Sequence, residues 1–315
     1  MNNCYLNSSL QLLTRIEGLK ERILSFKDKN INKNNITGGN LLKEFKIILE
    51  DIENNEKIIS PDNLKKEMAK LDKRYKHNHQ EDANEFISNF LDALREETLD
   101  KLSIKNKINP FQRESTEWEA YDKFYNKFYE KKGESFILDL FYGNYITKKF
   151  CKNCEKVLSV KFSAFNMIEL PIYELAKNSD NLDRDEIIKS YFSKTKIDNA
   201  TCDKCFNREV YTETRIFKLP QNLILFFGRT ANDQYIDNPI SYSETLNLDR
   251  FCDERCKSRN YYLDCVIEHS GYSDSGHYTA LCRNENNTWF YFSDDFYHEN
   301  PSEFYSENAI ILLYA

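Results

Sequence analysis

The residues with the clearest chemical potential are a histidine and two aspartates near the C-terminal end of the sequence. His277 follows a glycine and opens an apolar run, 278–282, while an aromatic run, 289–293, ends at Asp294 and Asp295. Two strands joined by the polar turn between these runs would form a hairpin that returns Asp294 or Asp295 to His277. A carboxylate beside an imidazole fixes its tautomer and stabilises the imidazolium, so the histidine would act as a general base.

A nucleophile for such a base lies at the other end of the chain, at Cys4. Asparagines precede it, and Leu6, Leu10 and Leu13 follow at helical spacing, which predicts a helix that begins at the cysteine. The partial positive charge at a helix N-terminus favours a thiolate. A cysteine that packs as a small apolar side chain is the simpler interpretation of this segment alone. The catalytic interpretation depends on the combination with His277.

Two Cys-x-x-Cys pairs predict a metal site. Cys151 and Cys154 form one pair, and Cys202 and Cys205 form the other. Four thiolates in two short knuckles suit tetrahedral zinc, and four protein ligands leave no open position, so the ion would be structural. The interval between the pairs is longer than in a compact zinc ribbon, and four unrelated thiols are the alternative. We interpret the remaining cysteines as packing residues: Cys252, Cys256, Cys265 and Cys282.

The order of helical and strand patterns predicts an α+β fold. Amphipathic helical spacing is clear at 41–52, in a helix that begins at Gln80, and in an aromatic stripe at 118–128. From Phe136 onward, aromatic and β-branched residues favour strands, interrupted by a helical insertion at 174–193. Helices followed by strands indicate an antiparallel sheet.

We expect one domain over residues 1–315, with a mainly helical part at 1–132 and a mainly β part at 133–315. The segment 309–314 is apolar throughout and is predicted to be a strand that is buried on both faces. His269 ends another predicted strand and is interpreted as a hydrogen-bonded structural residue.

Composition limits the classes of partner and compartment. The formal net charge is −7 and the pI about 5.5, which opposes a nucleic-acid surface and suits a basic partner better. No run approaches the ~18 apolar residues of a membrane helix, and no secretory signal pattern opens the sequence. The nine cysteines then predict reduced thiols or metal ligands in a reducing compartment, cytoplasmic or nuclear.

Taken in order, four blocks of the sequence resemble the ubiquitin-specific proteases, a family of cysteine deubiquitinases. Residues 2–8 (Asn-Asn-Cys-Tyr-Leu-Asn-Ser) resemble its cysteine box, and residues 80–86 (Gln-Glu-Asp-Ala-Asn-Glu-Phe) resemble its Gln-Gln-Asp box. The two Cys-x-x-Cys pairs match its zinc-bearing fingers, while 269–280 and 289–294 match its histidine box. Each block is weakly specific, whereas the ordered set is highly specific and spans the chain from its start to the final predicted strand.

The resemblance implies a papain-like cysteine protease core with a helical thumb, a β palm and zinc-bearing fingers. It also implies ubiquitin or ubiquitinated proteins as partners, with neither nucleic acid nor membrane. One structural Zn²⁺ would be held by the four paired cysteines, and no catalytic cofactor is needed. Cys4 would attack the carbonyl after the last glycine of ubiquitin, and His277 would take the thiol proton and then protonate the leaving amine.

Two departures from the family pattern bear on the site. The family has an oxyanion-hole asparagine five residues before its cysteine, but only three residues precede Cys4; one lost donor typically costs ~10²–10³ in kcat. Ser293 occupies the family's usual third catalytic position, normally Asp or Asn, and Asp294 follows it. Either Asp294 takes over the orientation of His277, or a one-residue shift puts Asp294 in the first place. Both alternatives favour Asp294 over Asp295.

Three functions therefore compete. The first is an active deubiquitinase, which hydrolyses the (iso)peptide bond after the C-terminal glycine of ubiquitin. The second is a weakly active or inactive ubiquitin-binding scaffold of the same fold, motivated by the missing upstream asparagine. The third is a zinc-finger module for nucleic acid, which the acidic balance and the lack of a Lys/Arg-rich stripe oppose. The presence of Cys4, His277 and Asp294 favours the first.

Overall fold

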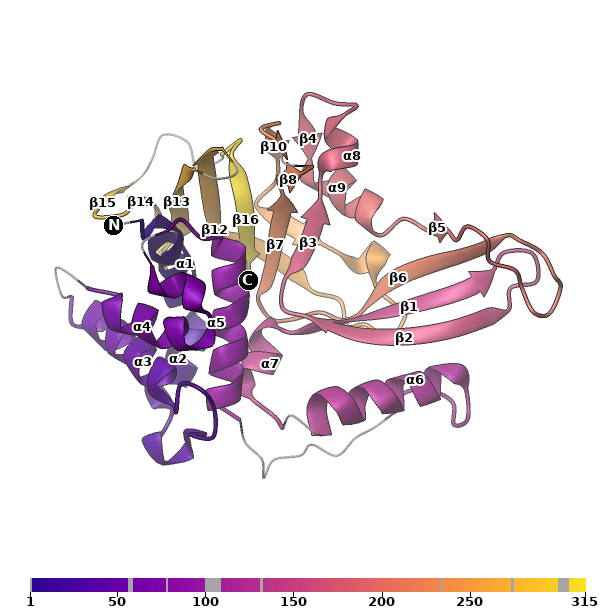
Figure 1. Ribbon diagram of the computed structural model, residues 1–315, viewed down its shortest axis with the longest axis horizontal. Helices are drawn as coiled ribbons and strands as arrows, with labels where there is room; N and C mark the ends of the chain where they lie inside the picture. The colour runs from indigo at the N-terminus through magenta and orange to yellow at the C-terminus, as the bar shows by residue number, and fades with distance from the viewer. Residues whose placement is uncertain are drawn as a thin grey trace.

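Helices make up the N-terminal part of the computed structural model (Figure 1), which describes residues 2–55, 59–77, 79–99, 109–130, 133–232, 234–272, 275–299 and 306–315. The first five helices are α1 (Cys4–Thr14), α2 (Glu17–Ser25), α3 (Asn40–Glu53), α4 (Asp62–Leu71) and α5 (Ala83–Glu97). Helices α3 and α5 confirm two of the predicted amphipathic segments. Helix α5 begins at Ala83, so Gln80 lies in the extended approach to it and not in its first turn.

Aromatic rings hold these helices together. Phe45 of α3 meets Phe90 of α5 edge to face with ring centroids 5.0 Å apart, and Phe86 stacks on Phe90 at 5.8 Å. All three side chains are fully buried. Burying one such ring contributes roughly 1.5–3 kcal/mol, so this cluster fixes α5 and the segment that leads into it.

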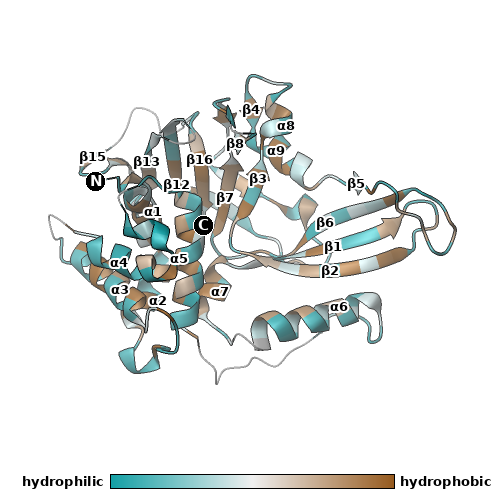
Figure 2. Ribbon diagram, in the orientation of Figure 1, coloured by the Kyte–Doolittle hydropathy of each residue, from teal (hydrophilic) through white to brown (hydrophobic). Residues whose placement is uncertain are grey.

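The palm is a large sheet with the last strand of the chain in its interior. Its strand order is β15 (Phe296–Glu299), β14 (Trp289–Ser293), β13 (Gly276–Arg283), β12 (Asn260–Gly271), β16 (Ala309–Tyr314), β7 (Leu223–Gly228) and β3 (Ile168–Pro171), with β11 (Thr245–Asn247) beside β12. Every residue of β16 is buried, which confirms the predicted two-sided burial. Figure 2 shows β16 and β7 in brown along most of their length, as expected for strands covered on both faces.

A buried arginine connects β16 to the loop after β7. Arg229 is 2% exposed, and within the described part of the chain its guanidinium donates to four backbone carbonyls, those of Ile236, Asn238, Glu307 and Ala309. Burial lowers the pKa of Arg229. Four carbonyl acceptors compensate much of the lost hydration. The Arg229 side chain therefore connects the loop after β7 to the start of β16.

Helix α1 lies between the helical part and the palm. It packs against α5 on one side and against β12, β13 and β14 on the other. Cys4, Tyr278 and Ala280 belong to one continuous apolar core that extends from the helices to the sheet. The packing therefore sets the first turn of α1 against the strand that carries His277.

A second sheet forms the fingers, which extend away from the palm in Figure 1. Its strand order is β2 (Val157–Phe165), β1 (Gly143–Cys151), β6 (Val210–Lys218) and β5 (Thr195–Lys196), and α6 (Thr116–Tyr125) packs along β2. Tyr121 of α6 meets Phe162 of β2 edge to face at 5.4 Å. The aromatic stripe predicted at 118–128 therefore faces the fingers, and no residue of α6 is fully buried.

The expectation of continuous strand character from Phe136 was wrong in its first part. Residues Phe136–Phe141 form helix α7, because the Ser135 hydroxyl accepts a hydrogen bond from the Ile137 N–H and caps it. Burial of one face of this short helix overrides the strand propensity of its aromatic residues. The predicted insertion at 174–193 contains two helices, α8 (Tyr173–Ala176) and α9 (Arg184–Tyr191), separated by β4 (Leu182–Asp183), which pairs with β10 (Ile240–Ser241).

One further hairpin, β8 (Thr230–Ala231) with β9 (Gln234–Tyr235), follows β7. Among the residues that the structure describes, no helix combines the length and the hydropathy that crossing a membrane requires.

Candidate active site

Cys4 is the first residue of α1 and is 5% exposed. Leu6, Leu10 and Leu13, whose spacing predicted this helix, are all buried. Because a helix begins at the cysteine, its sulfur lies beside N–H groups that have no partner within the helix. The predicted position of the thiol at a helix N-terminus is therefore confirmed.

His277 is the second residue of β13, and its side chain is exposed. The predicted hairpin is present, since β13 pairs antiparallel with β14, with Ala280 opposite Phe292. Its return brings Ser293 to the histidine, and the Ser293 hydroxyl lies 2.8 Å from Nε2 of His277. Among the described residues, this is the hydrogen bond that the His277 ring makes. In the preceding stretch 271–276, Ser273 and Asp274 lie outside the described residues.

Asp294 is hydrogen-bonded to α1. Its backbone is left-handed, with φ at 50°, and its Oδ1 accepts a hydrogen bond from Nδ2 of Asn7 at 2.7 Å. The structure therefore brings Cys4, His277, Ser293 and Asp294 into one neighbourhood, with the serine hydrogen-bonded to His277 and the aspartate to the helix that carries Cys4. Asp295 is exposed in the same turn.

A serine orients a histidine differently from a carboxylate. A carboxylate only accepts, so it holds the proton on Nε2 and leaves Nδ1 as the base. A hydroxyl can accept from Nε2 or donate to it, and donation would place the ring proton on Nδ1, where it blocks base catalysis. A neutral hydroxyl also does not offset the imidazolium charge. Ser293 thus permits the productive tautomer without enforcing it.

Gln80 holds the backbone immediately before His277. Its Nε2 donates to the Gly276 carbonyl at 2.7 Å, and its Oε1 accepts from the Gly276 N–H at 2.8 Å. The amide of one residue thus satisfies both backbone groups of another, across 196 positions of sequence. The sequence predicted Gln80 only as the start of a helix and as part of the block 80–86. The residues next to Gln80 in the sequence do not indicate that its side chain binds Gly276.

A second histidine, His269, packs against the backbone at Gly276. His269 is 7% exposed, and its Nδ1 lies 3.2 Å from the hydroxyl of Tyr235. A methyl group added at Gly276 would lie 2.2 Å from Nε2 of His269, so only glycine fits there. Burial lowers the pKa of His269, while Asp82 opposes that shift. The predicted role of His269 as a hydrogen-bonded structural residue is confirmed.

The four paired cysteines lie together at the far end of the fingers from the palm. Their sulfur atoms all lie within 4.8 Å of one another, with Cys151 and Cys205 3.6 Å apart and Cys154 and Cys202 3.6 Å apart. Such spacing fits four thiolates around one tetrahedral ion with metal–sulfur bonds of about 2.3 Å. The donor set and the geometry therefore fit a structural metal, and leave no room for a substrate ligand.

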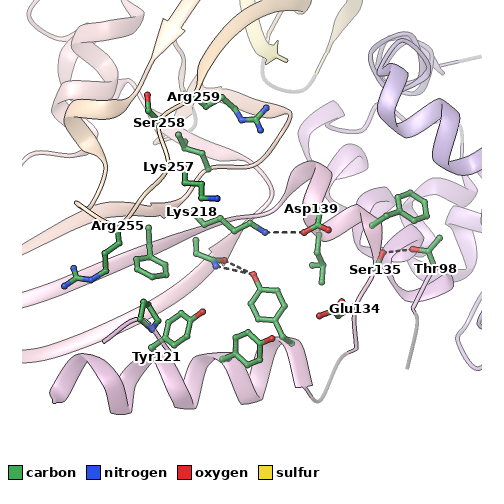
Figure 3. Close-up of a pocket in the computed structure, with 18 of the residues that line it drawn as sticks. Thr98, Tyr121, Glu134, Ser135, Asp139, Lys218, Arg255, Lys257, Ser258 and Arg259 are labelled. Carbon is green, nitrogen blue, oxygen red and sulfur yellow. Dashed lines mark hydrogen bonds and ion pairs between the residues drawn. The ribbon is translucent and has the colours of Figure 1, made fainter. Parts of the chain in front are cut away.

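A large pocket lies elsewhere. It has a volume of about 930 Å³ between α6, α7 and the loop before β12, and its walls include Tyr121, Asp139, Lys218 and Arg255 (Figure 3). Lys218 and Asp139 face one another across it at 3.6 Å. Neither Cys4 nor His277 lines this pocket, so it is separate from the candidate catalytic residues.

Comparison with solved structures places the fold. A chain of the SAGA Ubp8/Sgf11/Sus1/Sgf73 DUB module bound to ubiquitin aldehyde matches with a TM-score of 0.76 at 18% identity, over 99% of this chain and 67% of that one. A chain of the same kind of module bound to monoubiquitin matches with a TM-score of 0.75 at 18% identity, over 99% and 66%. The predicted α+β thumb, palm and fingers architecture is therefore confirmed.

Curated relatives agree with the fold. Ubiquitin carboxyl-terminal hydrolase Usp2 of Drosophila melanogaster is 26% identical over 99% of this chain and 34% of its own length. Ubiquitin carboxyl-terminal hydrolase 2 of Homo sapiens is 26% identical over 93% and 50%. The chain thus spans about a third to a half of these relatives. The family model described as ubiquitin carboxyl-terminal hydrolase matches residues 1–314. On this match over nearly the whole chain, the protein belongs to the ubiquitin carboxyl-terminal hydrolase family.

Proposed function

We propose that this chain is a cysteine-type deubiquitinase that hydrolyses the (iso)peptide bond after the C-terminal glycine of ubiquitin. One observation carries the proposal. Cys4 opens a helix that packs on the strand bearing His277, and the Nε2 of that histidine is hydrogen-bonded to Ser293, which leaves Nδ1 free to take a proton. A thiol, a base and an orienting group are the parts that nucleophilic acyl transfer requires.

The reaction proceeds in two balanced steps. The Cys4 sulfur attacks the glycine carbonyl carbon, the carbonyl electron pair moves to oxygen, and the thiol proton passes to Nδ1 of His277. Collapse of this intermediate expels the amine, which leaves with that proton, and an acyl-enzyme remains. Water then attacks the thioester carbonyl while its proton passes to His277, the carbon–sulfur bond breaks, His277 returns the proton to the Cys4 sulfur, and ubiquitin leaves as a free acid. Ser293 and Gln80 hold His277 in place throughout, and no catalytic cofactor takes part.

Family membership and two structurally similar modules support ubiquitin as the partner. The similar modules described above were solved with ubiquitin aldehyde and with monoubiquitin, and by analogy we assign ubiquitin or ubiquitinated proteins to this chain. The net charge of −7 opposes nucleic acid as a partner.

We also propose that Cys151, Cys154, Cys202 and Cys205 hold one Zn²⁺ as a structural ion at the fingertips. The mutual distances of the four sulfur atoms support this assignment. The other five cysteines are free thiols as well. A chain that needs both a thiol nucleophile and a thiolate metal site suits a reducing compartment, either cytoplasm or nucleus. A metal analysis of the purified chain tests the zinc assignment directly.

A second function of the same fold is a ubiquitin-binding scaffold of low activity. The observation that favours it is the serine hydroxyl on His277 where a carboxylate or carboxamide would enforce the tautomer. Such a protein would bind ubiquitin but turn it over slowly.

Reaction with ubiquitin that carries a thiol-reactive electrophile at its C-terminus separates these functions. We expect an adduct of one ubiquitin per chain by intact mass, absent in Cys4→Ala, which still binds ubiquitin. Binding without an adduct would move the assignment to the scaffold. If the chain neither binds ubiquitin nor forms an adduct, ubiquitin is excluded as the partner. An adduct that persists in Cys4→Ala would exclude Cys4 as the nucleophile.

A further inference from the structure

An exposed aromatic side chain lies beside the residue that holds His277. Phe296 of β15 is directly opposite Ser293 in the antiparallel pair of β14 and β15, and the Ser293 hydroxyl is hydrogen-bonded to His277. Opposite residues of such a pair project to the same face, with Cβ atoms about 4.5–5.5 Å apart. Phe296 is nevertheless 61% exposed, so a large apolar ring meets solvent next to the candidate catalytic histidine.

Two further rings extend this surface. His298 follows Phe296 on the same face with ring centroids 5.8 Å apart, and Tyr291 of β14 lies opposite His298 with ring centroids 5.1 Å apart. Tyr291, Phe296 and His298 together are called the β15 aromatic face. In the described part of the chain, β15 is the last strand at one edge of the palm. Figure 1 shows this edge at the left and the fingers at the right, so the β15 aromatic face is remote from the fingers.

The charges around this surface favour a cation. The hairpin residues 289–299 carry three exposed carboxylates and no Lys or Arg: Asp294, Asp295 and Glu299. Carboxylates and the faces of aromatic rings both attract positive charge. The other face of the same hairpin already binds a cation in this way, since the guanidinium of Arg15 lies over the Phe292 ring, 4.5 Å from its centroid. A basic segment of a partner therefore suits the β15 aromatic face.

The chemistry of the reaction indicates which part of the substrate lies there. When the tetrahedral intermediate collapses, the carbonyl carbon stays on the Cys4 sulfur, the carbon–nitrogen bond breaks, and the nitrogen takes the proton that His277 holds. Ubiquitin thus remains at Cys4, whereas the nitrogen and the protein that carries it leave from beside His277. The surface next to His277 and Ser293 therefore adjoins the leaving protein.

We propose that the β15 aromatic face binds the acceptor protein, through a basic segment around the lysine to which ubiquitin is joined. A Lys or Arg side chain of that segment lies over the Phe296 ring, and the neighbouring carboxylates attract its charge. This inference rests on the proposed deubiquitinase function and adds the chemical character of the acceptor. The net charge of −7 over the whole chain agrees with a basic partner.

Three substrates test the proposal on the full-length chain. One is ubiquitin fused through its C-terminus to a fluorogenic amine, which has no acceptor protein. The other two are ubiquitin joined by an isopeptide bond to the central lysine of a synthetic peptide, whose flanking residues are either basic or acidic. We expect the parent to hydrolyse the basic conjugate with the higher kcat/KM.

Phe296→Ser should lower kcat/KM on the basic conjugate roughly fivefold, through KM, because an exposed cation–π contact is lost. The same variant should change kcat/KM on the fluorogenic substrate by no more than about twofold. Phe296→Tyr retains a ring and should keep most of the rate on the basic conjugate.

Tyr297→Ser is the matched control. Tyr297 is 65% exposed and follows Phe296 in sequence, but it lies opposite Phe292, on the face that Arg15 contacts. It should behave like the parent on all three substrates. The same loss in Tyr297→Ser as in Phe296→Ser would overturn the assignment of the surface.

A loss of equal size on the fluorogenic substrate would also overturn the proposal, because it would place ubiquitin itself, and not the acceptor, at Phe296. Equal losses on the basic and acidic conjugates would overturn the basic character of the acceptor. Unaltered kcat/KM of Phe296→Ser on the basic conjugate, with turnover intact in the parent, refutes this inference alone. No Cys4-dependent turnover of any of the three substrates by the parent refutes the proposed function with it.

Discussion

Nδ2 of Asn7 donates a hydrogen bond to Oδ1 of Asp294 at 2.7 Å, and so joins the helix that begins at Cys4 to the turn that follows β14. The two residues are 287 positions apart in sequence. The preceding residue, Ser293, holds His277. Adjacent residues of one turn thus contact both α1 and His277, so the distance between α1 and His277 depends on the conformation of that turn.

Asp294→Ala should reduce activity more than Asp295→Ala. The first change breaks the hydrogen bond with Asn7. Because this bond is exposed, its loss is worth about 1 kcal/mol, which corresponds to roughly fivefold in kcat/KM. Asp295 is exposed and should change kcat/KM by less than twofold. Steady-state turnover of the fluorogenic ubiquitin substrate gives the ranking. A larger loss of kcat/KM in Asp295→Ala would mean that Asp295, and not Asp294, supports catalysis.

Ser293→Asp should make the enzyme faster. A carboxylate accepts from Nε2 of His277, fixes the tautomer with Nδ1 as base, and stabilises the imidazolium. An added charge-assisted hydrogen bond of about 1 kcal/mol corresponds to roughly a fivefold rise in kcat. Ser293→Asn should give a smaller rise and Ser293→Ala a fall. An equal or slower rate in Ser293→Asp would show that the hydroxyl does not limit the parent.

Gln80→Leu should lower kcat about tenfold while ubiquitin still binds. It removes both hydrogen bonds to Gly276 and lets the segment before His277 move. Gln80→Glu should be as harmful, because its carboxylate keeps the acceptor for the N–H but repels the carbonyl. Gln112→Leu, at an exposed glutamine before α6, is the control. Full activity in Gln80→Leu contradicts a positioning role.

The metal site predicts about one zinc per chain by elemental analysis. Cys202→Ser should lose that metal and speed hydrogen exchange in the fingers, since Cys202 is fully buried among the other ligands. Cys256→Ser, outside the cluster, should retain it. A folded parent without metal, or metal retained in Cys202→Ser, would refute the assignment.

His269 should make the fold less stable in mild acid. Burial holds the pKa of this imidazole below its ordinary value of about 6.5, so the unfolded chain binds a proton that the folded chain resists. Stability from this residue is present above about pH 6.5 and falls as the pH drops below it. His269→Gln should flatten that dependence of the urea midpoint between pH 7.5 and 5.5. His298→Gln, at an exposed histidine, should leave it as steep as in the parent.

Local periodicity predicted the elements that are buried on a simple pattern. The helix at 41–52, the apolar strand at 309–314 and the hairpin that returns to His277 all follow from side-chain spacing and turn chemistry. The aromatic segment that became α7 was misassigned, because a capping serine and one buried face outweighed strand propensity.

Long-range polar contacts were beyond the reach of the sequence. Gln80 on Gly276, Lys65 on Asn3 and Asn7 on Asp294 each join segments that only the packing of α1 on the palm brings together. Periodicity reports which face of an element is buried, and it carries no information on which polar groups meet there. Whether Ser293 or Asp294 faces His277 depends on a single left-handed residue in the turn, which spacing alone does not encode.

The position of β16 in the middle of the palm has a consequence for how the chain assembles. Residues 309–314 fill the gap between β12 and β7, and two of the four acceptors of Arg229 belong to residues 307 and 309. Without this segment, β12 and β7 would have no strand between them and the buried guanidinium would lack half of its acceptors. The six residues of β16 therefore join the strands beside His277 to the strands that lead to the fingers, so a change that weakens β16 would separate the two halves of the palm.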